Sequence, residues 1–279
     1  MRTIRTVNYH ITRRCNFKCK YCFAHFNGKH VKESLSVKDQ KELVKQIATC
    51  GYFERINFAG GEPMLDNNLS ELLQIVKEEG LKTSIITNGS QLTREWIGKN
   101  ADYIDIIGIS IDSIDENANK RIGRYSKIDE NFYNMISIVH ENGIKLKINT
   151  TVNAFNKNDT LTPFINTIRP FRWKVFQTTL IEGENSEEFN KISVTEESFN
   201  AFCEKNRKAL LQDIEMIKEQ SDEMISSYCM IDPLGRFFNN ANNKLSFSEP
   251  ILTVGIETAY QMMKYEYEKF KKRGGDYIF

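Results

Sequence analysis

Three cysteines fall within one short run, Cys15-Asn16-Phe17-Lys18-Cys19-Lys20-Tyr21-Cys22. Thiolates this close together on one loop can converge on a single metal centre. A [4Fe–4S] cluster usually takes four cysteine thiolates, so three thiolates would leave one iron open to an outside ligand. The other cysteines, Cys50, Cys203 and Cys229, are scattered and are interpreted as buried apolar thiols. A disulfide framework is not expected in a reducing compartment.

A zinc site is the alternative for the same cysteines. His25 follows Cys22 at a spacing that suits a structural Cys₃His zinc knuckle. The chain would then be a zinc-stabilised binding module without catalytic activity. A third interpretation is that the clustered cysteines are buried structural thiols.

The cysteine run lies in a chain of alternating apolar runs and helical patterns. Strands are expected at residues 7–12, 55–59, 83–87, 103–111, 145–152 and 174–181. Helical patterns separate them at residues 37–49, 69–79, 93–99, 131–142 and 159–167, with Ser36 and Asp66 as start signals and Gly80 and Gly143 at the ends. Repeated strand–helix units imply parallel strands with helical crossovers. The fold expected is therefore α/β, a partial (β/α)6 TIM-like barrel.

The pattern changes after residue 181. We expect a barrel core at residues 1–185 and an α+β extension at residues 186–279. Helical patterning at 196–208 and 258–272 flanks residues 227–239, where Asp232-Pro233-Leu234-Gly235 predicts a hairpin turn. The extension is expected to pack on the open side of the barrel and to close the ligand site.

The bulk composition is that of an ordinary globular protein. Of the 279 residues, 40% are hydrophobic and 27% are charged, and the net charge is +1. These values do not indicate a nucleic-acid or membrane surface, although a local cluster of Lys and Arg can still bind a small anion. Neither a signal peptide nor a run of about 18–20 apolar residues is seen. A cytoplasmic protein is therefore expected, and a monomer because no heptad pattern or exposed apolar face stands out.

A second motif, Gly60-Gly61-Glu62-Pro63, follows the second expected strand. Two glycines let the backbone approach a ligand closely, because no side chain stands in the way. Together with the CxxxCxxC spacing after the first strand, this motif resembles the radical S-adenosylmethionine (SAM) superfamily. The resemblance favours the cluster over zinc and implies that SAM chelates the free iron. The implied cluster ligands are Cys15, Cys19 and Cys22, and the implied SAM contacts are Tyr21 at the adenine and Gly60, Gly61 and Glu62 at the amino end.

Longer stretches resemble the viperin family of that superfamily. They span nearly the whole chain: Asn8-Tyr9-His10, residues 57–63, Thr87-Asn88-Gly89-Ser90, residues 109–113, Ile122-Gly123-Arg124, Lys147-Ile148-Asn149, residues 172–177, 180–185 and 272–278. The resemblance implies that a 5′-deoxyadenosyl radical takes the 4′-hydrogen of a nucleoside triphosphate. The resulting sugar radical then loses its 3′-hydroxyl and is reduced. The product would be the 3′-deoxy-3′,4′-didehydro nucleotide, a chain terminator in antiviral defence. It also implies that Ser110 and Arg124 hold the SAM carboxylate and that Asn88 lies near the SAM ribose or methionine portion.

Polar and charged residues alternate on two neighbouring strands. Lys147 and Asn149 lie two apart, as do Arg172 and Lys174, so each pair shares one face. Inside a small barrel these cations would need an anionic partner, and we expect them to bind the triphosphate, as the family resemblance also implies. The alternative is that they are solvated charges on edge strands.

Residues outside these two strands are further candidates. Tyr228 matches the family's substrate-site tyrosine and is a candidate proton donor to the departing hydroxyl or product radical; the alternative is that it fills the core. Asn8 and His10 alternate with Tyr9 and face either the substrate or a core hydrogen bond. Arg273 lies in Lys272-Arg273-Gly274-Gly275, which is expected to close over the phosphates; a disordered basic tail is the alternative.

The substrate base and the partners follow from the resemblance alone. CTP is favoured over UTP and GTP, because vertebrate members of the family use CTP and microbial members vary. An electron donor such as flavodoxin or ferredoxin is implied, with no nucleic-acid or membrane partner. The chain lacks the amphipathic helix with which vertebrate members begin, so no lipid association is expected. Another radical SAM enzyme acting on GTP is the remaining catalytic alternative.

Overall fold

The computed structural model describes residues 5–26 and 34–275. Its first six strands are β1 (Thr6–His10), β2 (Arg55–Ala59), β3 (Lys82–Thr87), β4 (Ile106–Ser110), β5 (Lys145–Val152) and β6 (Arg172–Gln177). The helices among them are α1 (Val37–Thr49), α2 (Leu69–Glu78), α3 (Arg94–Asn100), α4 (Glu116–Ile122), α5 (Glu130–Glu141) and α6 (Thr162–Ile168). Strands β1 to β6 pair in chain order and all run parallel, so the predicted α/β barrel fold is confirmed.

Local sequence explains where these elements begin and end. Helix α1 begins after Ser36, whose side chain accepts a hydrogen bond from the Asp39 N–H. Strand β4 begins later than predicted, because residues Ala101–Tyr103 form a short 3₁₀ turn. Helix α4 was not predicted, since seven residues give little periodic signal; Asp115 caps its start and Gly123, at φ 92°, ends it.

Among the described residues, six α-helices and four strands follow residue 185, together with a 3₁₀ turn at Ala241–Asn243. The helices and strands are α7 (Ser186–Ile192), α8 (Glu196–Arg207), β7 (Glu215–Glu219), α9 (Ser221–Met224), β8 (Cys229–Ile231), β9 (Arg236–Asn239), β10 (Ser246–Pro250), α10 (Ile251–Val254), α11 (Ile256–Gln261) and α12 (Tyr267–Lys272). The predicted hairpin is confirmed, because β8 and β9 pair antiparallel and the Gly235 N–H donates to the Asp232 carbonyl.

The prediction of a single helix at 258–272 is wrong. Helix α11 ends at Gln261 and α12 begins at Tyr267. The intervening backbone bonds elsewhere: the Glu266 N–H donates to the Ser226 carbonyl, and the Lys264 carbonyl accepts from the Asn239 side chain. These contacts replace the helical hydrogen bonds that a continuous helix would have made.

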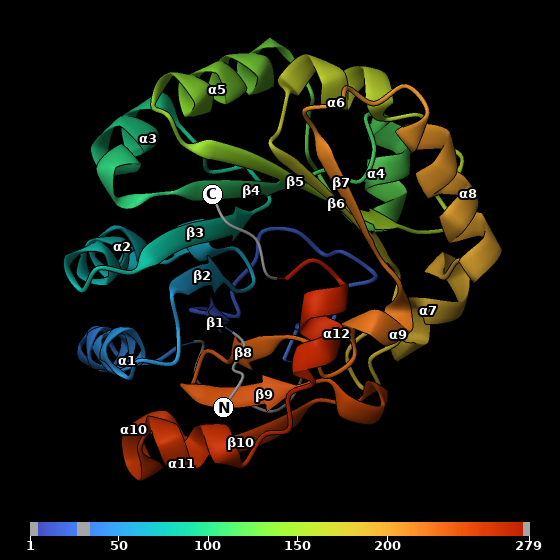
Figure 1. The fold of residues 1–279 in the computed structure, drawn as a ribbon. Helices are drawn as coiled ribbons and strands as arrows, with labels where there is room; N and C mark the ends of the chain where they lie inside the picture. Colours follow the sequence, from blue (N-terminus) through green and yellow to red (C-terminus); the bar gives the residue numbers. More distant parts are fainter. Residues whose placement is uncertain (1–4, 27–33, 276–279) are drawn as a thin grey trace.

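The later strands extend the sheet at both edges. The strand order is β10-β9-β8-β1-β2-β3-β4-β5-β6-β7, with β7 parallel to β6 and β8 parallel to β1. Figure 1 shows the sheet curling into an open barrel, with α1, α2, α3, α5, α6 and α8 around its outer face. Strands β5 and β6 are therefore interior strands of the sheet.

Side-chain alternation separates an apolar outer layer from a polar interior. On β1, Val7 and Tyr9 join the hydrophobic core, while Asn8 faces the barrel interior. On β6, Trp173 and Val175 join the core, while Lys174 faces inward. The core thus lies between sheet and helices, and the interior of the barrel is left for polar groups.

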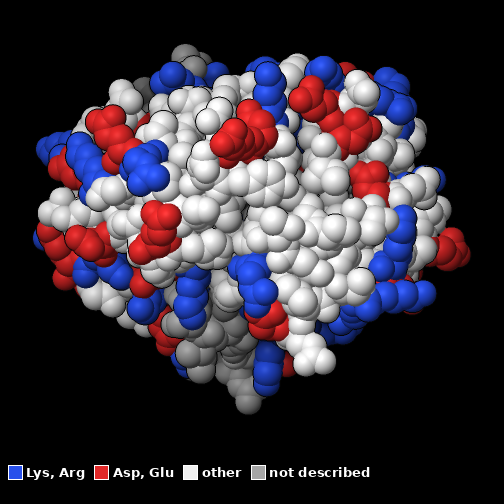
Figure 2. Space-filling model, turned by 90° about the horizontal axis from the view of Figure 1, so that it is seen from above, with Lys and Arg blue, Asp and Glu red and all other residues white. Residues whose placement is uncertain are grey.

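Charges of both signs are interspersed on the face seen in Figure 2. Among the described residues, no helix is both long and apolar enough to cross a bilayer.

Candidate functional site

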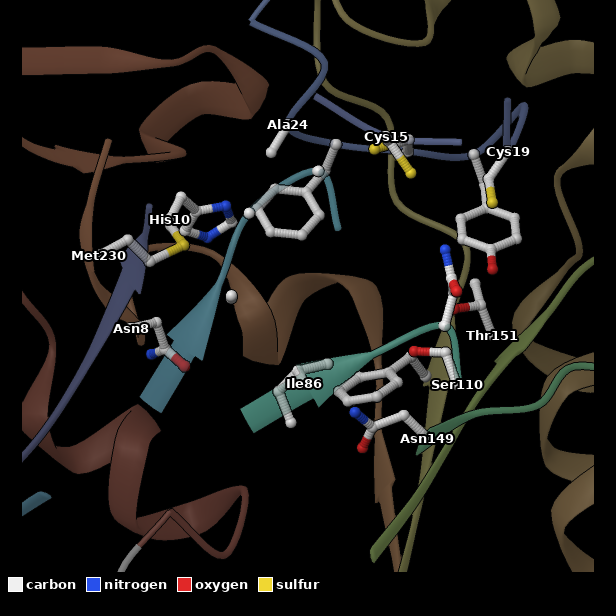
Figure 3. Close-up of a pocket in the computed structure, with 18 of the residues that line it drawn as sticks. Asn8, His10, Cys15, Cys19, Ala24, Ile86, Ser110, Asn149, Thr151 and Met230 are labelled. Atoms are coloured by element: carbon white, nitrogen blue, oxygen red, sulfur yellow. The ribbon is translucent and has the colours of Figure 1, made fainter. Parts of the chain in front are cut away.

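A cavity of about 330 Å³ opens at the carboxyl ends of the parallel strands. Figure 3 shows Cys15 and Cys19 at one end of it, Asn8, His10 and Met230 on one side, and Ser110, Asn149 and Thr151 on the other. The predicted site residues that line it are Asn8, Cys15, Cys19, Tyr21, Cys22, Gly60, Gly61, Asn88, Ser110, Arg124, Lys147, Asn149, Lys174 and Tyr228. Glu62, Arg172 and Arg273 do not line it.

The cysteine loop is held by backbone hydrogen bonds on two sides. On one side, the Gly61 N–H donates to the Thr12 carbonyl at 2.7 Å and the Glu62 N–H donates to the Arg14 carbonyl at 2.7 Å. On the other side, the Lys18 N–H donates to the Gly123 carbonyl at 3.0 Å. The loop is therefore clamped between the segment after β2 and the end of α4.

The glycines of this clamp are required by packing. A Cβ atom at Gly61 would lie 2.2 Å from the Arg14 carbonyl oxygen, and one at Gly60 would lie 2.6 Å from that of Thr12. The close backbone approach expected of the two glycines is thus made to the cysteine loop itself. Both glycines also line the cavity, so the motif shapes the site as well as supporting the loop.

The three thiols suit a metal cluster. All are free and half-buried, and all face the same cavity. Burial raises the pKa of Cys22 to about 11 and that of Cys19 to about 12, so both are protonated until a metal displaces the proton. The Arg124 guanidinium, with Nη1 3.6 Å from the Cys19 Sγ atom, favours the thiolate.

The zinc ligand set is not assembled in this part of the chain. The His25 Nδ1 atom lies 3.3 Å from the Glu184 carbonyl oxygen. Within residues 5–26 and 34–275, no three Cys, His, Asp or Glu side chains come together around a single metal ion. In a [4Fe–4S] cluster each thiolate binds a different iron, so the three sulfur atoms need not come together around one point.

A buried arginine lies beside the cysteine loop. Arg124 donates from Nη2 to the Ser110 carbonyl at 2.7 Å and from Nη1 to the Tyr21 hydroxyl at 2.8 Å. Its Nε atom is 3.4 Å from the Asp112 carboxylate, which also accepts a hydrogen bond from the Tyr21 hydroxyl. Asp112 was not singled out at the sequence level, although it lies within the matching stretch 109–113, directly after β4.

Glu62 supports the site from behind the cavity wall. Its fully buried carboxylate accepts hydrogen bonds from the Thr87 hydroxyl at 2.6 Å and from the Asn88 N–H at 2.7 Å. Burial raises its pKa. Its carboxylate thus fixes the turn that presents the Asn88 side chain to the cavity.

The floor of the cavity is cationic and buried. The Lys147 and Lys174 side chains come from β5 and β6 and are 8% and 5% exposed. The alternative of solvated charges on edge strands is therefore wrong. Burial, together with Arg172 and Arg273, lowers the pKa of Lys174 to about 8 although Glu219 opposes the shift. Burial and the nearby Lys174 lower the pKa of Lys147 well below its ordinary value.

The two arginines predicted to contact the phosphates, Arg172 and Arg273, lie deeper in the barrel than this floor. Arg172 donates to the Gly274 carbonyl at 2.6 Å and pairs with Glu215 at 3.2 Å. Arg273 donates from Nε to the Ser227 hydroxyl at 2.9 Å, and its guanidinium lies 3.5 Å from the centre of the Tyr228 ring. Arg273 borders a smaller cavity of about 40 Å³ below the floor, which Lys147, Lys174 and Arg55 also line.

The segment with Arg273 is docked against the barrel, because Arg273 is only 4% exposed. The disordered-tail alternative is therefore wrong for residues up to 275, whereas 276–278 of the matching stretch lie outside the described residues.

Asn8 and His10 occupy the wall on β1. The Asn8 side chain accepts from Asn57 at 2.6 Å and donates to the Cys229 carbonyl at 3.2 Å, so the core hydrogen bond is formed while Asn8 still borders the cavity. The His10 ring packs edge-on against Phe238 at 5.3 Å, and burial lowers its pKa to about 3. His10 therefore presents a neutral imidazole.

Comparisons with known proteins agree with this geometry. Residues 9–162 match the family model described as the Radical SAM superfamily. An S-adenosylmethionine-dependent nucleotide dehydratase of Flammeovirga pacifica is 39% identical, covering 98% of this chain and 96% of the relative. One of Lacinutrix mariniflava is 41% identical over 98% of this chain, which spans 58% of that relative. The chain belongs to the S-adenosylmethionine-dependent nucleotide dehydratases of the radical SAM superfamily. This membership confirms the resemblance to viperin and the prediction of a [4Fe–4S] cluster and SAM as cofactors.

Solved structures agree with the fold of this nucleotide dehydratase family member. Streptococcus suis SuiB, crystallised with S-adenosylmethionine, matches with a TM-score of 0.64 at 18% identity. The match covers 84% of this chain and 59% of SuiB. At that identity the likeness concerns the fold alone.

Proposed function

We propose that this chain converts a ribonucleoside triphosphate to its 3′-deoxy-3′,4′-didehydro analogue with loss of one water. CTP is the favoured substrate, with UTP and GTP as alternatives. The observation that carries the proposal is the pair of buried lysine side chains, Lys147 and Lys174, in the same cavity as three cysteine thiols. Relatives named as nucleotide dehydratases support it.

The cavity divides into two parts by chemistry. At the roof, Cys15, Cys19 and Cys22 would hold the cluster, which when bound supplies the electron that cleaves SAM to a 5′-deoxyadenosyl radical. SAM would be bound by nearby residues of the cavity wall and clamp, namely Tyr21, Gly60, Gly61, Asn88, Ser110 and Arg124. A guanidinium and neighbouring hydroxyl groups suit the SAM carboxylate and ribose.

The floor suits the phosphates. Burying ammonium groups is costly, and although Lys174 pairs with the Glu219 carboxylate, a polyphosphate would offset the remaining cost through charge-assisted hydrogen bonds. Asn149 lies opposite Lys174 in the register of β5 and β6, so its amide would join them. Arg273 would contribute its positive charge from the smaller cavity below the floor. Arg172 would hold the Gly274 backbone in place through its hydrogen bond to the Gly274 carbonyl.

Tyr228 is the proposed proton donor to the departing hydroxyl. Its hydroxyl lies 3.4 Å from the Lys174 Nζ atom, at the border between the two cavities. Replacement by Phe would keep the ring and remove the proton. Product formation that is unchanged in Tyr228→Phe would remove this role.

The decisive experiment is anaerobic. The chain is reconstituted with iron and sulfide, given SAM and dithionite, and offered CTP, UTP, GTP and ATP separately. Mass spectrometry should find 5′-deoxyadenosine and one nucleotide lighter by one water, both abolished in Cys19→Ala. SAM cleavage with no change in any nucleotide would contradict the proposed reaction and favour another radical SAM activity.

The biological setting is part of the proposal. A flavodoxin or ferredoxin would supply the electron in the cytoplasm to a monomeric enzyme, and the product would terminate chains in antiviral defence. The exposed Arg14 and Lys18 beside the cysteine loop suit an acidic electron carrier.

A further inference from the structure

A buried carboxylate, that of Glu219, lies behind the cationic floor. Neither cavity is lined by an Asp or Glu among the described residues, whereas Lys147, Lys174, Arg55 and Arg273 line one or both. Glu219, the last residue of β7, is completely buried behind this floor and opposite Phe176 of β6. Its contacts with Lys174 and Arg273 place it against the proposed phosphate site.

Three polar groups converge on Glu219. Its Oε1 atom forms an ion pair with Lys174 and lies 3.4 Å from the Arg273 Nη1 atom. Its Oε2 atom accepts a hydrogen bond from the Tyr228 hydroxyl. These contacts bring together one residue from β6, one from the segment before β8 and one after α12.

Charge explains why this carboxylate tolerates complete burial. A buried carboxylate is costly unless cations and hydrogen bonds compensate for lost hydration. Burial alone would raise the Glu219 pKa, but Lys174 and Arg273 hold it below its ordinary value. Glu219 is therefore ionised, and it offsets part of the repulsion that Lys174 experiences from Lys147, Arg172 and Arg273.

We propose that Glu219 is a positioning residue of this site, which holds the Tyr228 side chain and the Lys174 ammonium in place at the border of the cavity and, through its ion pair, keeps Lys174 charged. The proposal rests on the proposed function, because it assigns Glu219 a role in binding and turning over a nucleoside triphosphate. Nucleotide binding and nucleotide turnover are then affected separately. Charge on Lys174 governs affinity for the phosphates, whereas the position of Tyr228 governs the yield of product.

The first test is the affinity for CTP as a function of pH. Calorimetry uses the full chain reconstituted with its cluster and SAM but without reductant, so that no turnover occurs. In the wild type, the dissociation constant should rise as pH passes through about 8, where Lys174 loses its proton. In Glu219→Gln the same rise should occur at lower pH. For a pKa lowered by about one unit, binding at pH 8 should be about fivefold weaker, since Lys174 is half protonated there in the wild type, and near wild type at pH 6.5.

The second test is the yield of product per radical. With reductant and saturating CTP, Glu219→Gln should form 5′-deoxyadenosine in clear excess over the didehydro nucleotide. Glu219→Asp keeps the charge but shortens the side chain, so it should keep the wild-type pH profile and lose product yield. Glu223→Gln is the matched control, because this carboxylate pairs with Lys272 at 3.2 Å and borders neither cavity.

The outcomes are distinct. Wild-type chain that binds no nucleotide at any pH overturns the proposed function, whereas wild-type binding with an unchanged pH profile and yield in Glu219→Gln overturns the role of Glu219. If Glu219→Gln does not fold, the wild type still decides the charge of Lys174. CTP binding at pH 8 in buffers of different ionisation enthalpy should then take up a fraction of a proton, and no uptake would overturn that part of the proposal.

Discussion

Gly108 on β4 makes room for the side chain of Lys147 on β5. The two residues are opposite each other in the parallel register, and a Cβ atom at position 108 would lie 3.0 Å from the Lys147 Cε atom. It would also lie 2.5 Å from the Ile86 Cδ1 atom. The position of a proposed phosphate ligand therefore depends on a residue that has no polar side chain of its own.

We expect Gly108→Ala to weaken CTP binding by about tenfold, because displacement of Lys147 loses roughly one charge-assisted hydrogen bond, worth about 1.5 kcal/mol. Calorimetry on the reconstituted chain without reductant measures the change. Gly98→Ala is the matched control, since nothing lies within 4 Å of the added Cβ atom. Wild-type affinity in Gly108→Ala would argue against Lys147 as a phosphate ligand.

Gly61→Ala should prevent cluster assembly. The added Cβ atom would lie 2.2 Å from the Arg14 carbonyl oxygen, which is backbone and cannot move without the cysteine loop. Iron content after anaerobic reconstitution should fall to a small fraction of the wild-type value. In Gly98→Ala, an alanine within α3, iron content should be unchanged and stability should rise by up to about 1 kcal/mol. Full iron loading of Gly61→Ala would show that the clamp is dispensable.

Asp112→Asn should destabilise the fold. The substitution keeps the shape of a side chain that is 1% exposed but removes the carboxylate paired with the buried Arg124. An uncompensated buried charge costs roughly 3 kcal/mol, measurable by urea unfolding of the cluster-free chain. Asp115→Asn is the control, because Asp115 is exposed and asparagine also caps helices well. Equal stabilities for the two variants would refute the structural role of the Asp112 pair.

Acid should unfold the cluster-free chain partly through His10. Its pKa is lowered from 6.5 to about 3 by burial, so between these values the unfolded chain binds a proton that the folded chain does not. Its contribution to stability is therefore lost as pH falls from 6.5 towards 3, with a slope of about 1.4 kcal/mol per pH unit. His10→Phe should flatten the measured dependence of unfolding free energy on pH by about that slope. An unchanged slope in His10→Phe would exclude His10 as the source.

Much of the barrel could be predicted because its local signals agree. Alternation along 145–152 gave both the strand and the inward face of Lys147, and Ser36 marked the start of α1. Strand β7 escaped prediction because Glu215-Met216-Ile217-Lys218-Glu219 mixes charged and apolar residues in a run of five. This segment forms a strand because it pairs with β6, and its local sequence carries no signal of that pairing.

The sequence predicted which residue types meet at the candidate site, but not how deep in the barrel each side chain lies. Alternation puts Arg172 on the same face as Lys174, yet it does not say that Arg172 lies one layer lower and bonds to the Gly274 backbone. The GGEP motif identified Glu62, but not that its carboxylate would be used by Thr87 and Asn88. No sequence motif marks Glu219, because it is buried by contacts with residues from other elements of the fold.

The pairing of β1 with β8 also has a consequence for synthesis on the ribosome. Val7 lies opposite Cys229, so one edge of the first strand stays unpaired until the chain has been made beyond that cysteine. One edge of β6 likewise stays unpaired until β7 has been synthesised. Exposed strand edges invite pairing with other chains. A nascent chain that stalls before residue 215 should therefore aggregate or engage chaperones.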